Sequence, residues 1–375
     1  MDAPGVYLDH AATSPLLPEA LEAMIPFFGV GFANPSASYR AARAVRRAVD
    51  DARDVIAAFA GCEPDEVVFT SGGTEADNLA IRGAYDARPG PVVVTAVEHD
   101  AVLRTAGALD GTVIAVDGRG MVDLDALEAA IGADTTLVSA IAAQNETGVL
   151  TPLAAVAACV RRSAPQALLH VDAVQAAPFL LLASLVSEWD LVTISAHKIG
   201  GPKGTGALVV RRGARERLAP LIRGGGQERE LRAGTENVAG IVGFAAAAAV
   251  PTPPASRVAD LRDRLAAGIA GRIPDARVTG AGVPRAPQTL HLFIPGVASE
   301  ELLVLLDESG VAASAGSACA SGALEPSHVL RAMGWPADEA RSVVRFSLGR
   351  TTTADEIEQT VPIVAAAVDQ LRGNR

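Results

Sequence analysis

The chain has 375 residues, a formal net charge of −11, and 49% hydrophobic and 20% charged residues, values typical of a globular protein with a large core. The negative net charge argues against a nucleic-acid partner, because phosphate binding requires a surface rich in lysine and arginine. No apolar run is long enough to cross a membrane, and the first residues lack the pattern of a signal peptide, so we expect a cytoplasmic protein that does not contact membranes.

The first predicted element is a long helix in residues 36–61. Its apolar residues have helical spacing, a Ser or Asn at its start is the predicted N-cap, and Gly61 is the predicted C-cap. From residue 66 onward, helical patterns alternate with seven short β-rich runs, in residues 66–70, 91–96, 112–117, 136–143, 168–173, 191–196 and 206–212. Such nearly continuous apolar runs are typical of parallel strands buried on both faces, so the sequence predicts an α/β fold.

A proline-rich stretch follows this α/β pattern. Three of the four residues 251–254 are prolines, and helical periodicity resumes directly after them. The rest of the chain is a mixture of predicted strands and helices that suits a smaller α+β domain. We therefore expect a domain boundary at this stretch.

The segment SAHKIGGPKGTG, residues 195–206, contains both lysines of the protein, whereas the other 30 of the 32 basic residues are arginines. Lys198 follows a predicted buried strand, and ligands of open α/β sheets bind at the carboxyl ends of strands. A lysine amine can lose its proton and form a Schiff base, which an arginine guanidinium cannot do. A solvated charge in a glycine-rich turn is the alternative, and it is the preferred interpretation for Lys203. The pattern of a nucleotide-binding loop, G-x-x-x-x-G-K-[ST], is absent.

Other segments supply groups that a pyridoxal phosphate site needs. Asp172 ends a predicted strand, where its carboxylate would pair with a pyridinium, although helix N-capping is an equally common role. Gly73 and Thr74 lie at a predicted helix N-terminus, which suits a phosphate, although a plain capped helix has the same pattern. His99 follows a strand at the same sheet edge, where its ring could stack on a cofactor or move protons; a structural histidine is the alternative.

The cysteines and one buried arginine complete the candidate residues. Cys319 lies among Ala, Gly and Ser residues, where nothing bulky buries it, and is the candidate reactive thiol. Cys62 and Cys159 are predicted to be buried small apolar residues, and the wide spacing of the three cysteines excludes a disulfide framework or a zinc site, so no metal is expected. Arg345 lies inside an apolar strand, so we expect a carboxylate partner, either in a structural ion pair or on the substrate.

Taken in order, these motifs resemble those of cysteine desulfurases of the NifS/IscS type, in the class V aminotransferase family of fold type I pyridoxal phosphate enzymes. The motifs span almost the whole chain and are YLDHAATSP, NPSAS, TSGGTEADN, EHDAV, QNETG, HVDAVQ, SAHKIGGPKGTG, GGGQERELRAGTEN, SAGSACASG and VRFSLGRTTT. The resemblance implies a large domain, residues 13–252, with a mainly parallel seven-stranded sheet between helices. It also implies a small α+β domain, residues 1–12 and 253–375, which carries Cys319. Tyr39 stands where we expect a histidine in this family.

The resemblance also implies a role for each candidate residue. Lys198 would hold pyridoxal phosphate through a Schiff base and, once freed, remove the α proton of L-cysteine. Cys319 would take the sulfur as a persulfide and leave alanine. The remaining roles would be Asp172 at the ring nitrogen, Gln175 at the phenolic oxygen, His99 stacked on the ring, Gly73, Thr74, Ser195 and His197 around the phosphate with Thr235 from the second subunit of a homodimer, and Arg345, Asn145 and Asn34 at the substrate carboxylate.

The implied activity is cysteine desulfuration, with sulfur passed to acceptor proteins for iron–sulfur cluster assembly, tRNA thiolation or thio-cofactor synthesis. Another pyridoxal phosphate reaction, such as selenocysteine lysis or transamination, is the alternative on the same fold. A sulfur carrier without a catalytic lysine is disfavoured, because the composition avoids lysine yet keeps it at this position.

Overall fold

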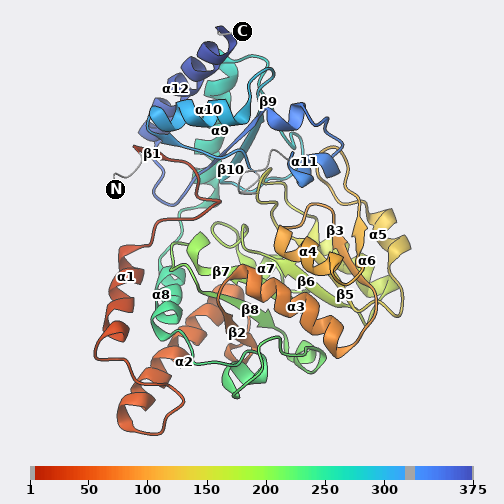
Figure 1. Ribbon diagram of the computed structural model, residues 1–375, viewed down its shortest axis with the longest axis vertical. Helices are drawn as coiled ribbons and strands as arrows, with labels where there is room; N and C mark the ends of the chain where they lie inside the picture. Colours follow the sequence, from red (N-terminus) through yellow and green to blue (C-terminus); the bar gives the residue numbers. More distant parts are fainter. Residues whose placement is uncertain (1–4, 317–325, 374–375) are drawn as a thin grey trace.

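The computed structural model describes residues 5–316 and 326–373, which form two lobes (Figure 1). The larger lobe contains a seven-stranded sheet, and each strand lies within one of the predicted runs, which confirms the α/β prediction. The strands are β2 (Val67–Thr70), β3 (Val92–Thr95), β4 (Thr112–Ile114), β5 (Leu137–Ile141), β6 (Leu168–Asp172), β7 (Leu191–Ser195) and β8 (Gly206–Val210).

The strand order in this sheet is β2-β8-β7-β6-β5-β3-β4. Strand β8 is antiparallel to both of its neighbours, and the other pairs are parallel. The connection from β7 to β8, residues 196–205, is too short for a parallel crossover, which needs a dozen or more residues. It contains only the 3-10 turn η3 (Ala196–Lys198), so Lys198 lies directly at the carboxyl end of β7.

Helices cover both faces of the sheet. In β2, Val67 and Phe69 pack into one hydrophobic core and Val68 packs into another, and the same alternation runs through the other central strands. The first core is shared with α2 (Arg40–Ala60), α6 (Leu153–Ser163) and α8 (Val238–Ala249), and the second with α3 (Gly73–Ala87) and α4 (Asp100–Gly107). This burial on both faces is the physical reason for the nearly continuous apolar runs in the sequence.

Helix α2 is the long helix that the sequence predicts, but its start differs from the prediction. Its N-cap position is Tyr39, which is extended and makes no side-chain cap hydrogen bond, so the predicted Ser or Asn cap is wrong. The Asn34 side chain instead accepts the N–H of Ser36, in a local turn ahead of the helix. The predicted glycine cap is confirmed, because Gly61 ends the helix in the left-handed conformation with φ of 69°.

The smaller lobe contains a three-stranded antiparallel sheet and three long helices. The sheet has the order β12-β10-β9, with β9 (Arg277–Val278), β10 (Thr289–Phe293) and β12 (Val343–Ser347), and the helices are α9 (Ala255–Arg272), α10 (Ser299–Glu308) and α12 (Ala354–Gly373). Strand β1 (Val6–Tyr7) pairs with β11 (Val311–Ala312), and Val6 and Leu8 join the core of this lobe. This packing supports our proposal that residues 1–12 and 253–375 form one domain and residues 13–252 the other.

The proline-rich stretch connects the lobes, because α8 ends at Ala249 in the larger lobe and α9 begins at Ala255 in the smaller one (Figure 1). Nine shorter elements complete the described chain: α1 (Pro18–Met24), η1 (Ile25–Phe28), η2 (Pro64–Glu66), α5 (Leu124–Ala130), α7 (Leu182–Leu185), η4 (Arg212–Arg217), η5 (Gln227–Glu230), α11 (His328–Ala332) and η6 (Glu339–Arg341). Among the described residues, no helix combines the length and the apolar character that crossing a membrane requires.

Candidate active site

A cavity of about 260 Å³ lies at the carboxyl ends of the parallel strands. Parallel strands end at one edge of the sheet, so the loops that follow them converge there. The candidate residues that line the cavity are Gly73, Thr74, His99, Asn145, Asp172, Gln175, Ser195, His197, Lys198 and Arg345. The fold therefore brings together residues from distant parts of the chain, from Ala11 to Arg345.

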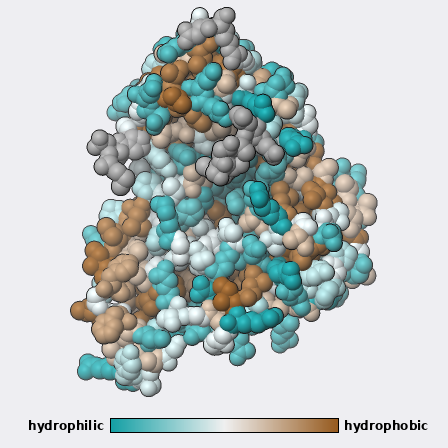
Figure 2. Space-filling model, in the orientation of Figure 1, coloured by the Kyte–Doolittle hydropathy of each residue, from teal (hydrophilic) through white to brown (hydrophobic). Residues whose placement is uncertain are grey.

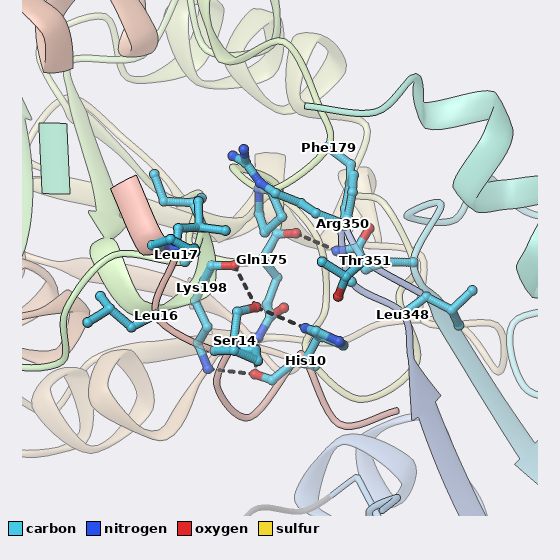
Figure 3. A pocket seen from close by; sticks show the side chains of 18 residues that line it. His10, Ser14, Leu16, Leu17, Gln175, Phe179, Lys198, Leu348, Arg350 and Thr351 are labelled. Carbon is cyan, nitrogen blue, oxygen red and sulfur yellow. Dashed lines mark hydrogen bonds between the residues drawn. The ribbon is translucent and has the colours of Figure 1, made fainter. Parts of the chain in front are cut away.

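Lys198 projects from the turn that follows β7. Its Nζ donates hydrogen bonds to the carbonyl oxygens of Ala11, at 2.5 Å, and Ala12, at 2.8 Å, and Figure 3 shows the side chain extended toward this segment. Burial, together with the positive charge of Arg345, lowers the pKa of the Lys198 amine to about 8. An amine with a pKa in this range is partly neutral, and therefore nucleophilic, near physiological pH.

A second cavity, of about 150 Å³, shares Ala11, Gln175 and Lys198 with the first. Figure 3 shows it, with the Ser14 hydroxyl between the His10 ring and the Lys198 carbonyl, to which Ser14 donates a hydrogen bond of 3.1 Å. Residues 11–14 near the N-terminus therefore contact both the main chain and the side chain of Lys198.

Asp172 is the last residue of β6 and is buried at the floor of the cavity. Its Oδ1 accepts the N–H of Val174 at 2.9 Å. Burial raises the pKa of the Asp172 carboxyl, and the neighbouring His99, Val174 and Lys198 act in the opposite direction. A cation bound against this carboxyl in the cavity would lower its pKa and so favour the ionised form.

Two more acids, Asp77 in α3 and Glu98 before α4, are buried near Asp172. Burial, followed by the charge of Asp172, raises the pKa of Asp77 well above its usual value, and burial raises the pKa of Glu98 to about 8. Glu98 is therefore largely protonated at neutral pH, and the uncharged form of Asp77 is favoured. Acids that lack their negative charge do not repel the Asp172 carboxylate.

The start of α3 forms a second feature of the cavity wall. Gly72 has a φ of 152° and a ψ of −176°, a conformation that essentially only glycine adopts, and it leads into the helix at Gly73. The N–H groups in the first turn of such a helix attract anions. Thr74, Ser195 and His197 line the same cavity. Burial lowers the pKa of His197 to about 4, so its neutral ring can donate one hydrogen bond at neutral pH.

Arg345, in β12, has the carboxylate partner that the sequence predicts. Its side chain is 2% exposed, and its Nη2 lies 2.7 Å from Oδ1 of Asp9. Its Nη1 donates to the carbonyl oxygens of Asn145, at 2.8 Å, and Gly316, at 3.2 Å. Its buried Nε has no hydrogen-bond partner among the described residues. The guanidinium is thus fixed by three contacts and keeps a donor for a further acceptor.

Three candidate residues are not part of this cavity wall. Asn34 and Thr235 are exposed, in the segment before α2 and in the loop before α8, and Cys319 lies outside the described residues. Of the other cysteines, Cys159 is buried, as the sequence predicts. Cys62 is only partly buried, and burial raises the pKa of its thiol to about 12, which makes it a poor nucleophile.

Three acids that contact or surround the site residues were not predicted from the sequence. Asp9 holds Arg345, and Asp77 and Glu98 surround Asp172. All three lie in the motifs YLDHAATSP, TSGGTEADN and EHDAV. Each of these acids has polar neighbours in the sequence, so no local pattern marks it as buried.

The family model for class-V aminotransferases matches residues 6–360 of the chain. The chain belongs to this family. Over 98% of its length it is 45% identical to a cysteine desulfurase of Cereibacter sphaeroides, of which the match covers 96%. A solved NifS-like protein has a TM-score of 0.87 and 33% identity, over 96% of this chain and 98% of the other. A solved structure of SspA in complex with cysteine has a TM-score of 0.80 and 32% identity, over 93% and 100%.

These relatives confirm the predicted resemblance and fold type, and they show that this class-V aminotransferase is a pyridoxal-phosphate-dependent cysteine desulfurase. The cavity fits that cofactor. It offers an amine with a pKa of about 8, a buried carboxyl whose pKa a bound cation would lower, and a helix N-terminus that attracts an anion. An aldehyde, a ring nitrogen and a phosphate are the complementary groups.

The lowered pKa of Lys198 predicts how cofactor loading depends on pH. Only the neutral amine attacks an aldehyde, so the rate at which the cofactor-free protein takes up pyridoxal phosphate should rise about tenfold per pH unit below pH 8 and level off above it. Stopped-flow measurement of the yellow absorbance band gives this rate. A rate that keeps rising to pH 10.5, the usual pKa of lysine, would show that the site does not lower the pKa.

Proposed function

We propose that the residues of the 260 Å³ cavity, together with Cys319, carry out the desulfuration of L-cysteine. The observation that carries this proposal is that Lys198, Asp172 and the N-terminus of α3 face one cavity. When bound there, pyridoxal phosphate supplies an electron sink for the α carbon of the amino acid. Lys198 would hold the cofactor covalently, and its free amine would take the α proton of the substrate.

The cofactor-binding roles follow from the environment of each side chain. Asp172 pairs with the ring nitrogen, because an ionised buried carboxyl keeps that nitrogen protonated. His99 stacks on the ring and is oriented by the N–H of Ala101, which its Nδ1 accepts at 3.1 Å. Gln175, whose Nε2 donates to the Ala11 carbonyl at 2.8 Å, serves the phenolic oxygen. The phosphate is held by the first turn of α3 with Gly73 and Thr74, and by Ser195 and His197.

Arg345 and Asn145 bind the substrate carboxylate. The Nε–H of Arg345 has no acceptor among the described residues, and an unpaired buried donor of this kind gains most from a charged acceptor. Asp9 fixes the guanidinium at 2.7 Å without occupying this donor. We also assign Asn34 to the carboxylate, by way of a second copy of the chain, since it is exposed on its own chain.

Cys319 receives the sulfur. Its thiolate attacks the sulfur of the bound substrate, the bond between that sulfur and the β carbon breaks, and the carbon fragment is released as alanine after protonation. Replacing Cys319 with alanine should therefore leave cofactor binding intact and reduce sulfide and alanine formation at least about 100-fold, the range expected for loss of a chemical group that acts in the reaction. Both products and the yellow absorbance band are measured on the purified variant.

Cys62→Ala is the matched control, because the Cys62 thiol has a pKa of about 12 and the cysteine is only partly buried. Its turnover should equal that of the native protein. Native turnover in the Cys319→Ala variant would remove Cys319 from the mechanism.

The functional unit is a homodimer, in keeping with the dimers typical of the family. Figure 2 shows apolar residues gathered over α1 and the segment that follows it. Val30 is 90% exposed and Phe32 is 82% exposed, and the exposed set also includes Leu21, Ile25 and Phe28. Monomers rarely expose such a patch, so a second copy of the chain is the occupant that we propose for it. Sedimentation of the purified protein tests this, and a 38.3 kDa species alone would contradict it.

The persulfide sulfur passes from Cys319 to protein acceptors, such as those of iron–sulfur cluster assembly or tRNA thiolation. Transfer of labelled sulfur from the purified protein to candidate acceptors tests this step. Release of all the sulfur as free sulfide in the presence of each acceptor would contradict it.

A further inference from the structure

The loop of residues 224–237, between η4 and α8, has an unusual backbone. Three consecutive residues other than glycine have positive φ angles: Glu228 at 43°, Arg229 at 58° and Glu230 at 67°. L-residues avoid this region because the side chain approaches the backbone too closely, so other contacts must hold the turn. The site described above does not explain why the chain maintains it.

A buried ion pair holds this turn in place. The carboxylate of Glu228 receives two hydrogen bonds from Arg53 in α2, at 2.7 and 2.9 Å, and one from the backbone N–H of Phe69 in β2, at 2.8 Å. The Arg53 and Glu228 side chains are 4% and 2% exposed. Removing such a pair from water is costly, and apolar residues would often stabilise a fold equally well, which suggests a geometric role for the pair.

Two further ion pairs fasten the loop after this turn. Arg232 lies 2.9 Å from Glu75, which is in the first turn of α3 next to Thr74. Arg46 in α2 lies 3.0 Å from Glu236. The loop is therefore fixed on both sides of residues 233–235 to the helices α2 and α3.

The tip of the loop, by contrast, is open to solvent. Gly234 and Thr235 are exposed, and the Gly234 N–H donates to Oε1 of Gln227 at 3.1 Å. Thr235 does not line the cavity of its own chain. The loop is fixed on both sides of its tip, so the exposed Thr235 hydroxyl has a defined position from which it can contact another molecule.

We propose that the buried pair of Arg53 and Glu228 is a positioning pair, which fixes Thr235 for the cofactor phosphate of a second copy of this chain. This inference rests on the homodimer proposed above and on the role of Thr235 in the second subunit that the family resemblance implies. The pair holds the turn, and the turn sets the path of residues 231–237. The Thr235 hydroxyl would then donate a hydrogen bond to the phosphate without a loss of loop entropy at each binding event.

Mixed dimers with two different affinity tags test the proposal. One subunit carries Lys198→Ala, so that the yellow absorbance band reports cofactor binding only in the other subunit. The double substitution Arg53→Met and Glu228→Met removes the pair without leaving a buried charge, and it is placed in either subunit. Titration with pyridoxal phosphate gives the dissociation constant, and thermal unfolding of each mixed dimer shows that it is folded.

The double substitution should raise the dissociation constant about tenfold when it is in the Lys198→Ala subunit, as expected for loss of one hydrogen bond to a charged group, and less than about threefold when it is in the other subunit. Hydrogen exchange of residues 231–237 should become faster in the double variant, because the turn loses the contacts that hold it.

Thr235→Val, placed in either subunit, distinguishes the positioning role of Arg53 and Glu228 from the role of Thr235 in the homodimer. If Thr235→Val weakens binding only from the Lys198→Ala subunit and the double substitution does not, the inference is wrong and the homodimer proposal stands. The inference would also be wrong if the double substitution raised the dissociation constant only when placed in the cofactor-binding subunit. If Thr235→Val has no effect from the opposite subunit, the proposed role of Thr235 itself fails.

Discussion

Replacing Lys198 with alanine is expected to give a colourless protein whose turnover of L-cysteine is at least about 10³-fold lower, the range for loss of a positioned proton-transfer group. The cavity then has no amine that can hold the cofactor or take the α proton. Lys198→Arg should be equally inactive, because a guanidinium stays protonated and is not a nucleophile. Absorbance spectra and assays of sulfide and alanine measure these effects.

The chain has only one other lysine, which provides the control for this prediction. Lys203 is the only other lysine, and it is exposed in the turn before β8. Lys203→Ala should retain the colour and the turnover of the native protein. After borohydride reduction of the loaded protein, the cofactor label should be found on the peptide with Lys198, and a label on Lys203 alone would refute the proposed site.

Replacing Asp172 with asparagine is expected to lower turnover by about 10² to 10³-fold, the equivalent of leaving a buried charge without its partner. An amide is close in size to the carboxyl but carries no negative charge, so it cannot keep the cofactor ring nitrogen protonated. The electron-withdrawing strength of the ring then falls, while Lys198 remains able to bind the cofactor. Steady-state kinetics and a nitrogen-15 NMR spectrum of the labelled cofactor measure the two consequences.

Asp77→Asn is the matched control for this substitution, since Asp77 is an equally buried acid at the same cavity. Burial and the charge of Asp172 raise the pKa of Asp77 and favour its uncharged form, which an amide resembles in size and charge. Its effect on turnover should be less than about tenfold. Equal losses in the two variants would show that the charge of Asp172 is not the property that matters.

Part of the fold is determined by local sequence patterns. The seven strands of the large sheet were predicted from apolar runs, because a strand buried on both faces must be apolar along its whole length. The end of α2 at Gly61 was predicted because glycine adopts the left-handed cap readily. The start of α2 was not, because the Asn34 side chain bonds to Ser36 instead of to the first turn of the helix.

The direction of β8 shows a similar limit. Its apolar run, GALVV, does not differ from those of the parallel strands. The strand is antiparallel because the loop that precedes it is too short for a crossover. The length of the loop, and not the composition of the strand, therefore sets the direction of β8.

The candidate site divides in the same way. The sequence alone identified Lys198, because it is one of two lysines and follows a buried strand, and it predicted a carboxylate partner for Arg345 from the apolar strand around it. Only the tertiary structure selected Asp9 as that partner, from 336 positions away, and surrounded Asp172 with two acids of raised pKa. Periodicity and composition indicate which residues are buried and which are exposed. Ion pairs and pKa values depend instead on distances between residues that only the folded chain brings together.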